Sequence, residues 1–544
     1  MQISDWHKKK VLFLGDSISH GAFYIDFLEA YLLEHFSDEC DANIVNIGLS
    51  AETVSGLSET GHPFPRPCLH DRLERALKKV EPDFVFLCYG MNDAIYAKLD
   101  EARFAAYQDG VRKALAQAKG CGAVTVLLTP TPFDTKSYAS PLSDEEVPPE
   151  GYLKPYQNYN ETLCAYAQWA KKLTPADGAD YTVDVYSALS DYLMQAYENN
   201  ADFRSGDGIH PNPAGHWVMT KTILKTLFHI TLDRVPDYVV CPQESRFFSM
   251  LSENNLMLAN AWREAVGHSN PNKAEALPLE EALEQAKERR ATIVHLARER
   301  GKRIEKSDWY GFTRYDFYVH GREGLLIEPK RRRDGSPWIW RAEFFGAFDK
   351  ADRALLEDGC FLGYCRLSDL YGNEEAVALM EAFRRFVTGE FGLRQQAVLF
   401  GFSRGGLYSV NYTARYPKNV AALYLDAPVL DIKSWPKGAG KGGGAPKEWI
   451  ECLAAYHINE EGLADFRKNP LDHIPVLLEN EIPILLVAGG ADTVVPYAEN
   501  GALLAEKYQA GGGTIQVIVK PDCGHHPHSL EDVTPIEDYL KQFL

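Results

Sequence analysis

The sequence contains no apolar run that approaches the ~18 residues needed to cross a membrane. The first apolar run, residues 11–14, is only four residues long before Gly15, which is too short for the core of a secretory signal. The ten cysteines include no C-x-x-C pair, and the closest two, Cys360 and Cys365, lie five positions apart. Such cysteines are typical of reduced thiols. These absences together predict a cytoplasmic protein with no membrane segment.

Positive charge is also scarce. The chain has 57 Lys and Arg against 76 Asp and Glu, which gives a formal net charge of −19 at pH 7. Proteins that bind nucleic acids or anionic membranes need clustered Lys and Arg. The one dense basic run, residues 330–333, is followed at once by Asp334 and Gly335, and we interpret it as a solvated turn. We therefore expect neither a nucleic acid nor a membrane as a partner.

What the chain does contain is enough apolar residue for sizeable cores. Of its 544 residues, 45% are hydrophobic and 24% are charged, a composition typical of soluble globular proteins. Domains usually have about 100–200 residues, so this length predicts two large domains or three smaller ones.

The first 230 residues alternate short apolar runs with amphipathic, helix-like stretches. Five buried strands are predicted, at residues 11–14, 44–47, 84–89, 124–128 and 182–185. Strict alternation of strand and helix predicts an α/β domain whose parallel sheet has helices on both faces. We place this domain at residues 1–232.

The strand signals stop at about Asp233 and return after Trp309. Two helical stretches, residues 245–266 and 279–303, lie between these points, and the second is dense in charge. We expect residues 233–306 to form a helical linker. A second α/β domain is then expected at residues 307–544.

The second domain is predicted to have a mostly parallel, eight-stranded sheet. Its strands are expected at residues 317–320, 325–329, 338–344, 361–365, 397–400, 421–425, 484–488 and 515–519. A glycine-rich segment, residues 438–444, lacks the Lys-Ser or Lys-Thr ending of a phosphate-binding loop. We interpret it as part of a small lid insertion around residues 428–480.

A serine follows the first predicted strand directly, in the segment Gly15-Asp16-Ser17-Ile18. A serine there lies at the carboxyl end of a parallel strand, where active sites of open α/β sheets are usually found. Its own N–H opens a helix and can stabilise a developing oxyanion. The motif alone is weak evidence of catalysis, because serine is also a favoured helix N-cap.

Three further segments supply partners for Ser17. Gly48 follows the second strand, where its N–H can act as a second oxyanion donor, and the Asn92 side chain after the third strand can act as a third. Near the end of the domain, Asp207 and His210 lie on one turn. The carboxylate can therefore orient the imidazole, which serves as general base on the serine.

These four segments resemble the four blocks of the SGNH (GDSL-like) hydrolase family over roughly residues 9–230. The resemblance implies a flavodoxin-like three-layer fold in which Ser17 is the nucleophile and His210 is the base, supported by Asp207. It also implies an oxyanion hole made by the Ser17 N–H, Gly48 and Asn92.

The residues of these motifs most resemble those of the carbohydrate-esterase-like branch of the SGNH family, whose members remove small acyl groups, especially acetyl, from sugars. Two positions depart from the family pattern. Ile18 replaces the leucine of the GDSL name, and Ala51 stands where many relatives have glycine, which could change the shape of the acyl pocket.

A second serine motif, Gly-x-Ser-x-Gly around Ser403, also follows a predicted strand. Its glycines permit the sharp turn that holds a serine clear of the sheet, and Arg404, the next residue, offers an oxyanion N–H. Asp492 and then His525 follow later strands, so the order is Ser, Asp, His. This resembles the α/β-hydrolase fold from about residue 307 to the end.

Some roles in the second site stay open at the sequence level. His525 is preferred over His526 as the base, because relatives commonly have Gly-His directly after the final strand. The Arg404 side chain either forms a salt bridge within the fold or meets an anionic substrate group. The second oxyanion donor is expected near residues 340–344, where the usual His-Gly signature is absent.

Three histidines within four residues, His525, His526 and His528, also suggest a zinc site. No carboxylate or cysteine set with suitable ligand spacing accompanies them, and the general-base role explains their position better. We therefore predict no metal and no cofactor.

The leading hypothesis is a bifunctional carboxylic ester hydrolase that removes acyl groups, above all acetyl, from an oligosaccharide or glycoside. An alternative is an SGNH esterase fused to a peptidase-like α/β-hydrolase domain, since that fold also hosts peptidases. A third makes one domain a non-catalytic module for carbohydrate binding or assembly.

Overall fold

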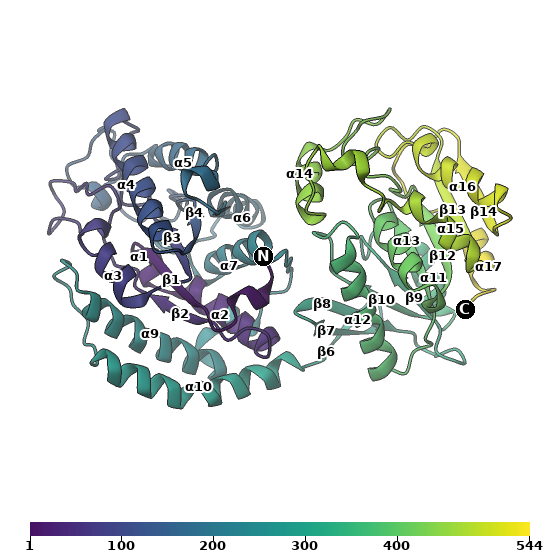
Figure 1. Ribbon diagram of the computed structural model, residues 1–544, viewed down its shortest axis with the longest axis horizontal. Coiled ribbons are helices and arrows are strands. Elements are labelled where there is room, and N and C mark those ends of the chain that lie inside the picture. The colour runs from purple at the N-terminus through teal and green to yellow at the C-terminus, as the bar shows by residue number, and fades with distance from the viewer. The chain divides into compact units, whose positions relative to one another are not determined.

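The computed structural model describes residues 1–544, and the chain divides into two compact units (Figure 1). The first unit comprises residues 1–228 and 233–301, and the second comprises residues 229–232 and 302–544. Both units are α/β, as predicted. None of the helices combines the length and the apolar character that crossing a membrane requires.

The first unit is built on a five-stranded, wholly parallel sheet. Its strands are β1 (Lys10–Gly15), β2 (Asn43–Asn46), β3 (Phe84–Cys88), β4 (Val124–Leu128) and β5 (Tyr181–Val183). Their order in the sheet is β2-β1-β3-β4-β5. This order is flavodoxin-like, which confirms the predicted fold class. The central strands are almost entirely apolar because helices cover both faces of the sheet.

Helices pack in two layers around this sheet, apart from the short α1 (Ser17–His20). One layer contains α2 (Phe23–Phe36), α6 (Val185–Asn199) and α7 (Pro213–Phe228). The other contains α3 (Leu73–Val80), α4 (Glu101–Gly120) and α5 (Tyr159–Ala170). Within the second layer the rings of Tyr107 and Tyr166 stack with centroids 4.4 Å apart.

The segment expected to be a linker belongs largely to the first unit. After α8 (Asp237–Val240), the long helices α9 (Arg246–Val266) and α10 (Leu279–Gly301) pack on each other and on α2, and α9 also lies along the edge strand β2 (Figure 1). Phe248 of α9 packs on Phe27 of α2 with ring centroids 5.1 Å apart. The dense charge of α10 concealed its packing in the sequence, because that helix buries only Ala282, Ala286, Ile293 and Ala297.

The second unit contains a nine-stranded sheet rather than the eight strands expected. Its strands are β6 (Glu305–Trp309), β7 (Phe312–Val319), β8 (Arg322–Glu328), β9 (Trp338–Arg341), β10 (Phe361–Cys365), β11 (Ala397–Phe402), β12 (Val420–Asp426), β13 (Ile484–Gly489) and β14 (Ile515–Lys520). The unpredicted strand is β6, whose residues 305–308 are polar and exposed, so that no apolar run marks it.

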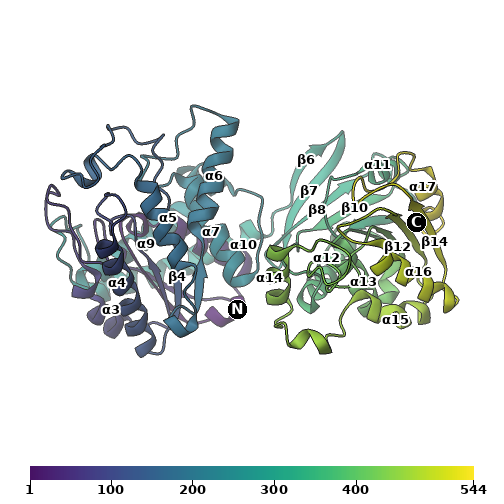
Figure 2. The same ribbon diagram turned by 90° about the horizontal axis from the view of Figure 1, so that it is seen from above.

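The order of the strands is β14-β13-β12-β11-β9-β10-β8-β7-β6. β9 to β14 pair in parallel, whereas β6, β7 and β8 form an antiparallel extension at one edge (Figure 2). The sheet is therefore largely parallel, as predicted for an α/β-hydrolase domain.

Two apolar cores lie on the two faces of this sheet. One face carries α12 (Glu374–Glu390), α13 (Gly405–Arg415), α15 (Ile474–Glu479) and α16 (Gly501–Ala510), and the other carries α11 (Lys350–Glu357) and α17 (Thr534–Leu540). The segment between β12 and β13 contains α14 (Pro446–Ala455) and α15, which places the predicted insertion there.

Candidate active sites

Ser17 is the first residue of α1, immediately beyond the carboxyl end of β1. Asp16 caps the helix, because its Oδ1 accepts a hydrogen bond of 3.0 Å from the Ile18 N–H. Burial, with a contribution from Asp93, raises the pKa of Asp16 to about 7. The local sequence thus turns the chain sharply after β1 and leaves the Ser17 side chain at the sheet edge.

The structure brings Ser17, His210 and Asp207 into one hydrogen-bonded chain. The Ser17 Oγ lies 2.7 Å from His210 Nε2, and His210 Nδ1 lies 2.8 Å from Asp207 Oδ2. The other oxygen of Asp207 accepts the backbone N–H groups of Ile209 and His210 at 2.9 and 2.7 Å. The carboxylate is therefore fixed by its own turn and orients the imidazole toward the serine.

The electrostatics of this pair suit a general base. Burial acts to lower the pKa of His210, but the hydrogen bond and charge of Asp207 outweigh it and raise that pKa above its ordinary value. Burial likewise opposes the charge on Asp207, but the hydrogen bonds from His210 and Ile209 lower its pKa to about 2. The imidazolium that forms during proton transfer is thus stabilised by a carboxylate that stays charged.

The other two predicted oxyanion donors, Gly48 and Asn92, lie in the loops after β2 and β3, the strands that flank β1 in the sheet. Asn92 is buried, and one of its amide hydrogens donates to the Glu52 carbonyl at 3.2 Å while Tyr96 donates to its oxygen at 3.0 Å. These contacts fix the orientation of the Asn92 amide and leave its second amide hydrogen for a substrate oxygen.

Gly48 packs directly on α1. A Cβ at this position would lie 2.7 Å from the backbone nitrogen of His20, so only glycine fits here. The Gly48 N–H donates to Asn46 Oδ1 at 2.9 Å, while the Asn46 amide donates to the Ser19 carbonyl at 2.8 Å. A substrate oxygen must therefore share or displace the Asn46 oxygen to use the Gly48 donor.

Helix α9 contributes two side chains to the loop that contains Gly48. Arg263 Nε donates to the Gly48 carbonyl at 2.8 Å, and Asn270, just beyond the helix, donates to the Ser50 carbonyl at 2.8 Å. Both side chains lie in residues 233–306, the segment predicted from the sequence to be a linker. No motif signal marked them, because a single arginine in a helix and a single asparagine after it are ordinary in any sequence.

Ala51, the departure noted in the sequence, has a backbone φ of +64°. This left-handed conformation favours glycine and strains an alanine. The structure thus gives a backbone reason for glycine at this position.

In the second unit, Ser403 occupies a sharp turn between β11 and α13. Its φ is +47°, a strained conformation for a non-glycine residue, and its N–H donates to the Asp426 carbonyl at 2.9 Å. Such strain is found at nucleophile turns, where it holds the hydroxyl away from the sheet.

Ser403, His525 and Asp492 form a second hydrogen-bonded chain. Ser403 Oγ lies 2.9 Å from His525 Nε2, and His525 Nδ1 lies 2.7 Å from Asp492 Oδ2. Asp492 Oδ1 accepts the N–H groups of Val494 and Val495 at 2.8 and 2.9 Å. The structure thus pairs Ser403 with His525 rather than with His526.

The Arg404 side chain forms an ion pair within the fold. Its Nη2 lies 2.7 Å from Glu343 Oε2, and its guanidinium packs on the rings of Phe344 and Tyr371 at 5.6 and 5.4 Å. The loop that contains Glu343 follows β9 and packs against the turn of Ser403, since a Cβ on Gly405 would lie 3.6 Å from the Glu343 nitrogen. This is the loop in which the sequence placed the second oxyanion donor.

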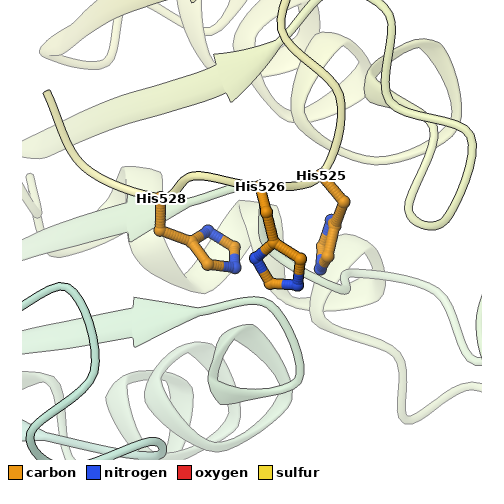
Figure 3. A group of neighbouring side chains, drawn as sticks. All are labelled: His525, His526 and His528. Carbon is orange, nitrogen blue, oxygen red and sulfur yellow. The ribbon is translucent and has the colours of Figure 1, made fainter.

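The other two histidines of the cluster lie beside the base (Figure 3). His526 is exposed, whereas His528 is buried and its Nδ1 lies 2.8 Å from Asp426 Oδ1. Neither ring is within the hydrogen-bonded chain of Ser403.

Two α/β units that each hold a Ser–His–Asp chain beside a parallel sheet define a two-domain hydrolase. Comparison with known families agrees. Residues 13–218 match the GDSL-like lipase/acylhydrolase family, and residues 364–544 match the prolyl oligopeptidase family. The chain thus fuses an N-terminal GDSL-like (SGNH) hydrolase domain to a C-terminal α/β-hydrolase domain.

Several solved structures are similar to less than half of the chain, at low identity. An acetylxylan esterase from Geobacillus stearothermophilus is 21% identical, with a TM-score of 0.31, over 43% of this chain and 100% of that one. A gut microbial diltiazem-metabolizing enzyme is 18% identical, with a TM-score of 0.31, over 40% of this chain and 47% of that one. Dipeptidyl peptidase 4 of Porphyromonas gingivalis is 13% identical, with a TM-score of 0.34, over 45% of this chain and 36% of that one. No curated protein matches the chain.

Proposed function

We propose that the protein is a bifunctional serine esterase and that its N-terminal domain removes small acyl groups, above all acetyl, from carbohydrates. The observation that carries the proposal is the pair of separate Ser–His–Asp chains, with serine–histidine distances of 2.7 Å at Ser17 and 2.9 Å at Ser403.

The hydrogen-bonded Ser–His–Asp groups of the two sites support the same two-step ester hydrolysis. The histidine accepts the hydroxyl proton as the serine oxygen bonds to the ester carbonyl carbon, and it returns that proton to the leaving alcohol. Water, deprotonated by the same histidine, then releases the acid from the acyl-serine. In the first domain the Ser17 N–H and the Asn92 amide are suited to stabilise the oxyanion, together with Gly48 once Asn46 gives way.

Two features support a carbohydrate ester as the substrate of the first site. Its four motif segments resemble the carbohydrate-esterase-like branch of the SGNH family. In addition, the side chains of His210 and Asp207 are 42% and 60% exposed. A site this open can receive an acyl group that projects from a large polar molecule.

The second site is more enclosed, since the side chains of His525 and Asp492 are 7% and 1% exposed. The match to the prolyl oligopeptidase family favours a second candidate for this domain, an aminoacyl or dipeptidyl peptidase. A purely non-catalytic module is disfavoured because the Ser403 chain of hydrogen bonds is complete.

The ten cysteines are all free, which supports a reducing compartment such as the cytoplasm. The substrate in that setting would be an oligosaccharide or a glycoside rather than an intact polymer.

The proposal is tested with Ser17→Ala and Ser403→Ala in the full chain, using exposed Ser307→Ala of β6 as a matched control. Acetylated and aromatic-acylated oligosaccharides, aryl acetates and aminoacyl anilides serve as substrates, with products measured by mass spectrometry. Each nucleophile variant should lose one activity by a factor of about 10³ or more and keep the other. Loss of anilide hydrolysis in Ser403→Ala would identify a peptidase, and unchanged rates in both variants would refute catalysis by these serines.

A further inference from the structure

The three histidines after β14 form a cluster of which hydrolysis needs only one. The potential ligand nitrogens of His525, His526 and His528 all lie within 4.8 Å of one another. Figure 3 shows the three rings beside one another on a single loop. Two imidazoles next to the base therefore have no part in the chemistry described above.

Two of these imidazoles are held by buried carboxylates in the same way. His525 Nδ1 lies 2.7 Å from Asp492, and His528 Nδ1 lies 2.8 Å from Asp426. Both aspartate side chains are 1% exposed. A carboxylate that accepts the Nδ1 hydrogen leaves the lone pair on Nε2, and this carboxylate–histidine arrangement is the one that orients metal-binding histidines.

Asp426 is itself fixed in place. Its Oδ2 accepts the Ser529 N–H at 2.7 Å and the Tyr424 hydroxyl at 3.1 Å. His528 thus has a preset orientation although no step of hydrolysis requires it.

His526 completes the cluster from the solvent side. Its ring is exposed and stacks on Phe348 with centroids 5.6 Å apart and an interplanar angle of 13°. An ion can therefore reach the cluster directly from water.

We propose that His525, His526 and His528 bind a divalent transition-metal cation, with Zn²⁺ as the best-suited ion, and that this binding switches the C-terminal site off. Zn²⁺ takes imidazole nitrogens at about 2.0–2.1 Å in tetrahedral geometry, with water in an open fourth position. Three such nitrogens lie about 3.3 Å apart by that geometry. In this structure the three histidine nitrogens lie within 4.8 Å of one another. Rotation of the exposed His526 ring, with small shifts of the other two rings, would bring them to the separation that the ion requires.

Inhibition follows from the single lone pair of His525 Nε2, which lies 2.9 Å from the Ser403 hydroxyl. Once that lone pair binds the cation it can no longer accept the serine proton, which stays on Ser403. The cation and the substrate reaction thus compete for one nitrogen atom. No comparable set of three ligands surrounds His210, so the first site should be insensitive. The inhibitory part of this inference rests on the proposed role of Ser403, whereas the binding part does not.

Binding is measured on the full chain, freed of metal with EDTA and then dialysed against ZnCl₂, with bound zinc determined by mass spectrometry. His526→Gln should weaken zinc binding by a factor of about 10 or more, because it removes one ligand. His295→Gln, an exposed histidine of α10, is the matched control and should bind as the unmodified chain does. Equal zinc binding by the unmodified chain and His526→Gln would overturn the site.

Inhibition is measured as the rate at which a fluorophosphonate labels Ser403 and Ser17, quantified separately on their peptides. Zn²⁺ should slow labelling of Ser403 by a factor of at least about 10, and EDTA should restore it, while Ser17 stays unaffected. His526→Gln should label normally without metal and lose the sensitivity to Zn²⁺.

The remaining outcomes distinguish zinc binding from inhibition by zinc, and both of these from the proposed activity of Ser403. Equal slowing at both serines, or unchanged sensitivity in His526→Gln, would overturn the switch, as would zinc bound at the cluster with Ser403 labelling intact. Failure of Ser403 to label in any sample would refute the proposed second active site and with it the switch, and the zinc measurements would still decide the metal site.

Discussion

Arg263 Nε donates a hydrogen bond of 2.8 Å to the carbonyl oxygen of Gly48, 215 residues earlier in the chain. The arginine is 4% exposed, and burial together with Arg72 lowers its pKa to about 10, so it is charged at neutral pH. A buried cation thus holds Gly48, the residue predicted to supply one of the oxyanion donors. Helix α9, which lies beyond the segment that matches the family, is therefore part of the support for this site.

Replacing Arg263 with methionine should slow Ser17-dependent ester hydrolysis. The Gly48 carbonyl would lose a buried donor, at a cost of about 1–3 kcal/mol of stability, and the loop could rotate. We expect kcat to fall by a factor of about 10 with a smaller change in KM, because the loop matters most when the oxyanion forms.

Steady-state kinetics with an aryl acetate check this expectation. Arg263→Lys, which keeps one donor, should recover part of kcat, and exposed Arg289→Met of α10 should behave like the unmodified protein. A fall in stability with kcat unchanged would show that Arg263 is structural only.

Replacing Ala51 with glycine should stabilise the first domain. The left-handed φ of +64° destabilises an alanine by about 1–2 kcal/mol. Glycine relieves this strain but loses more backbone entropy on folding, which offsets about 0.5–1 kcal/mol of the stabilisation. The net effect is a stabilisation of about 0.5–1 kcal/mol by these same terms, measured by urea unfolding. Ala116→Gly, at an exposed site in α4, should instead destabilise by about 1 kcal/mol. If Ala51→Gly also destabilised the domain, the result would contradict the proposed backbone strain at Ala51.

The pH dependence of the first site should report on His210. Only the neutral imidazole can accept a proton, and the hydrogen bond and charge of Asp207 outweigh burial and raise its pKa above 6.5. The rate of Ser17 modification should therefore rise with pH, with a midpoint above 6.5. Asp207→Asn should move the midpoint to lower pH and cut the rate by about 10⁴. An unchanged midpoint in that variant would contradict the assignment of the titrating group.

Asp26 should make the first domain less stable as pH rises. Burial raises its pKa from 3.8 to about 7, so the folded chain holds a proton there that the unfolded chain has lost. The favourable contribution is complete below pH 3.8 and fades as the pH rises to about 7, by at most about 1.4 kcal/mol per pH unit.

The matched comparison is Asp26→Asn, which does not titrate; its amide oxygen keeps one acceptor, for Ser252 or Asn255, and its NH₂ group replaces the other carboxylate oxygen. The stability of the unmodified chain relative to this variant should decrease between pH 4 and pH 7 in urea unfolding. Exposed Glu288→Gln should show no such trend, and a difference independent of pH would contradict the raised pKa of Asp26.

Much of the fold was predictable because parallel strands buried on both faces are nearly continuous apolar runs. All five strands of the first sheet and eight of the nine in the second overlap predicted apolar runs, although β7 and β8 are antiparallel and only the last three residues of β7 lie within its run. β6 was not predicted because residues 305–308 are polar and exposed, so no apolar run marks the strand. Its pairing with β7 is made by backbone hydrogen bonds.

The site residues likewise divide into those that local sequence predicts and those that only tertiary packing brings to the site. Ser17, His210 and Ser403 follow strands or share a turn with their partners, so local sequence was sufficient to find them. Arg263 acts across 215 positions through tertiary packing, and nothing near it in the sequence indicates its partner. The clustering of His526 and His528 with the base was visible in the sequence, but the Asp426 that orients His528 was not.

The polar strand β6 has a consequence for how copies of this protein meet. An edge strand offers unpaired backbone groups to any neighbouring chain, and charged side chains along it make such pairing unfavourable. Glu305, Lys306 and Asp308 place charge along this edge, where residues 305–308 are exposed. The second sheet is thus protected against edge-to-edge pairing at β6, and self-association of the enzyme should not proceed by sheet extension there.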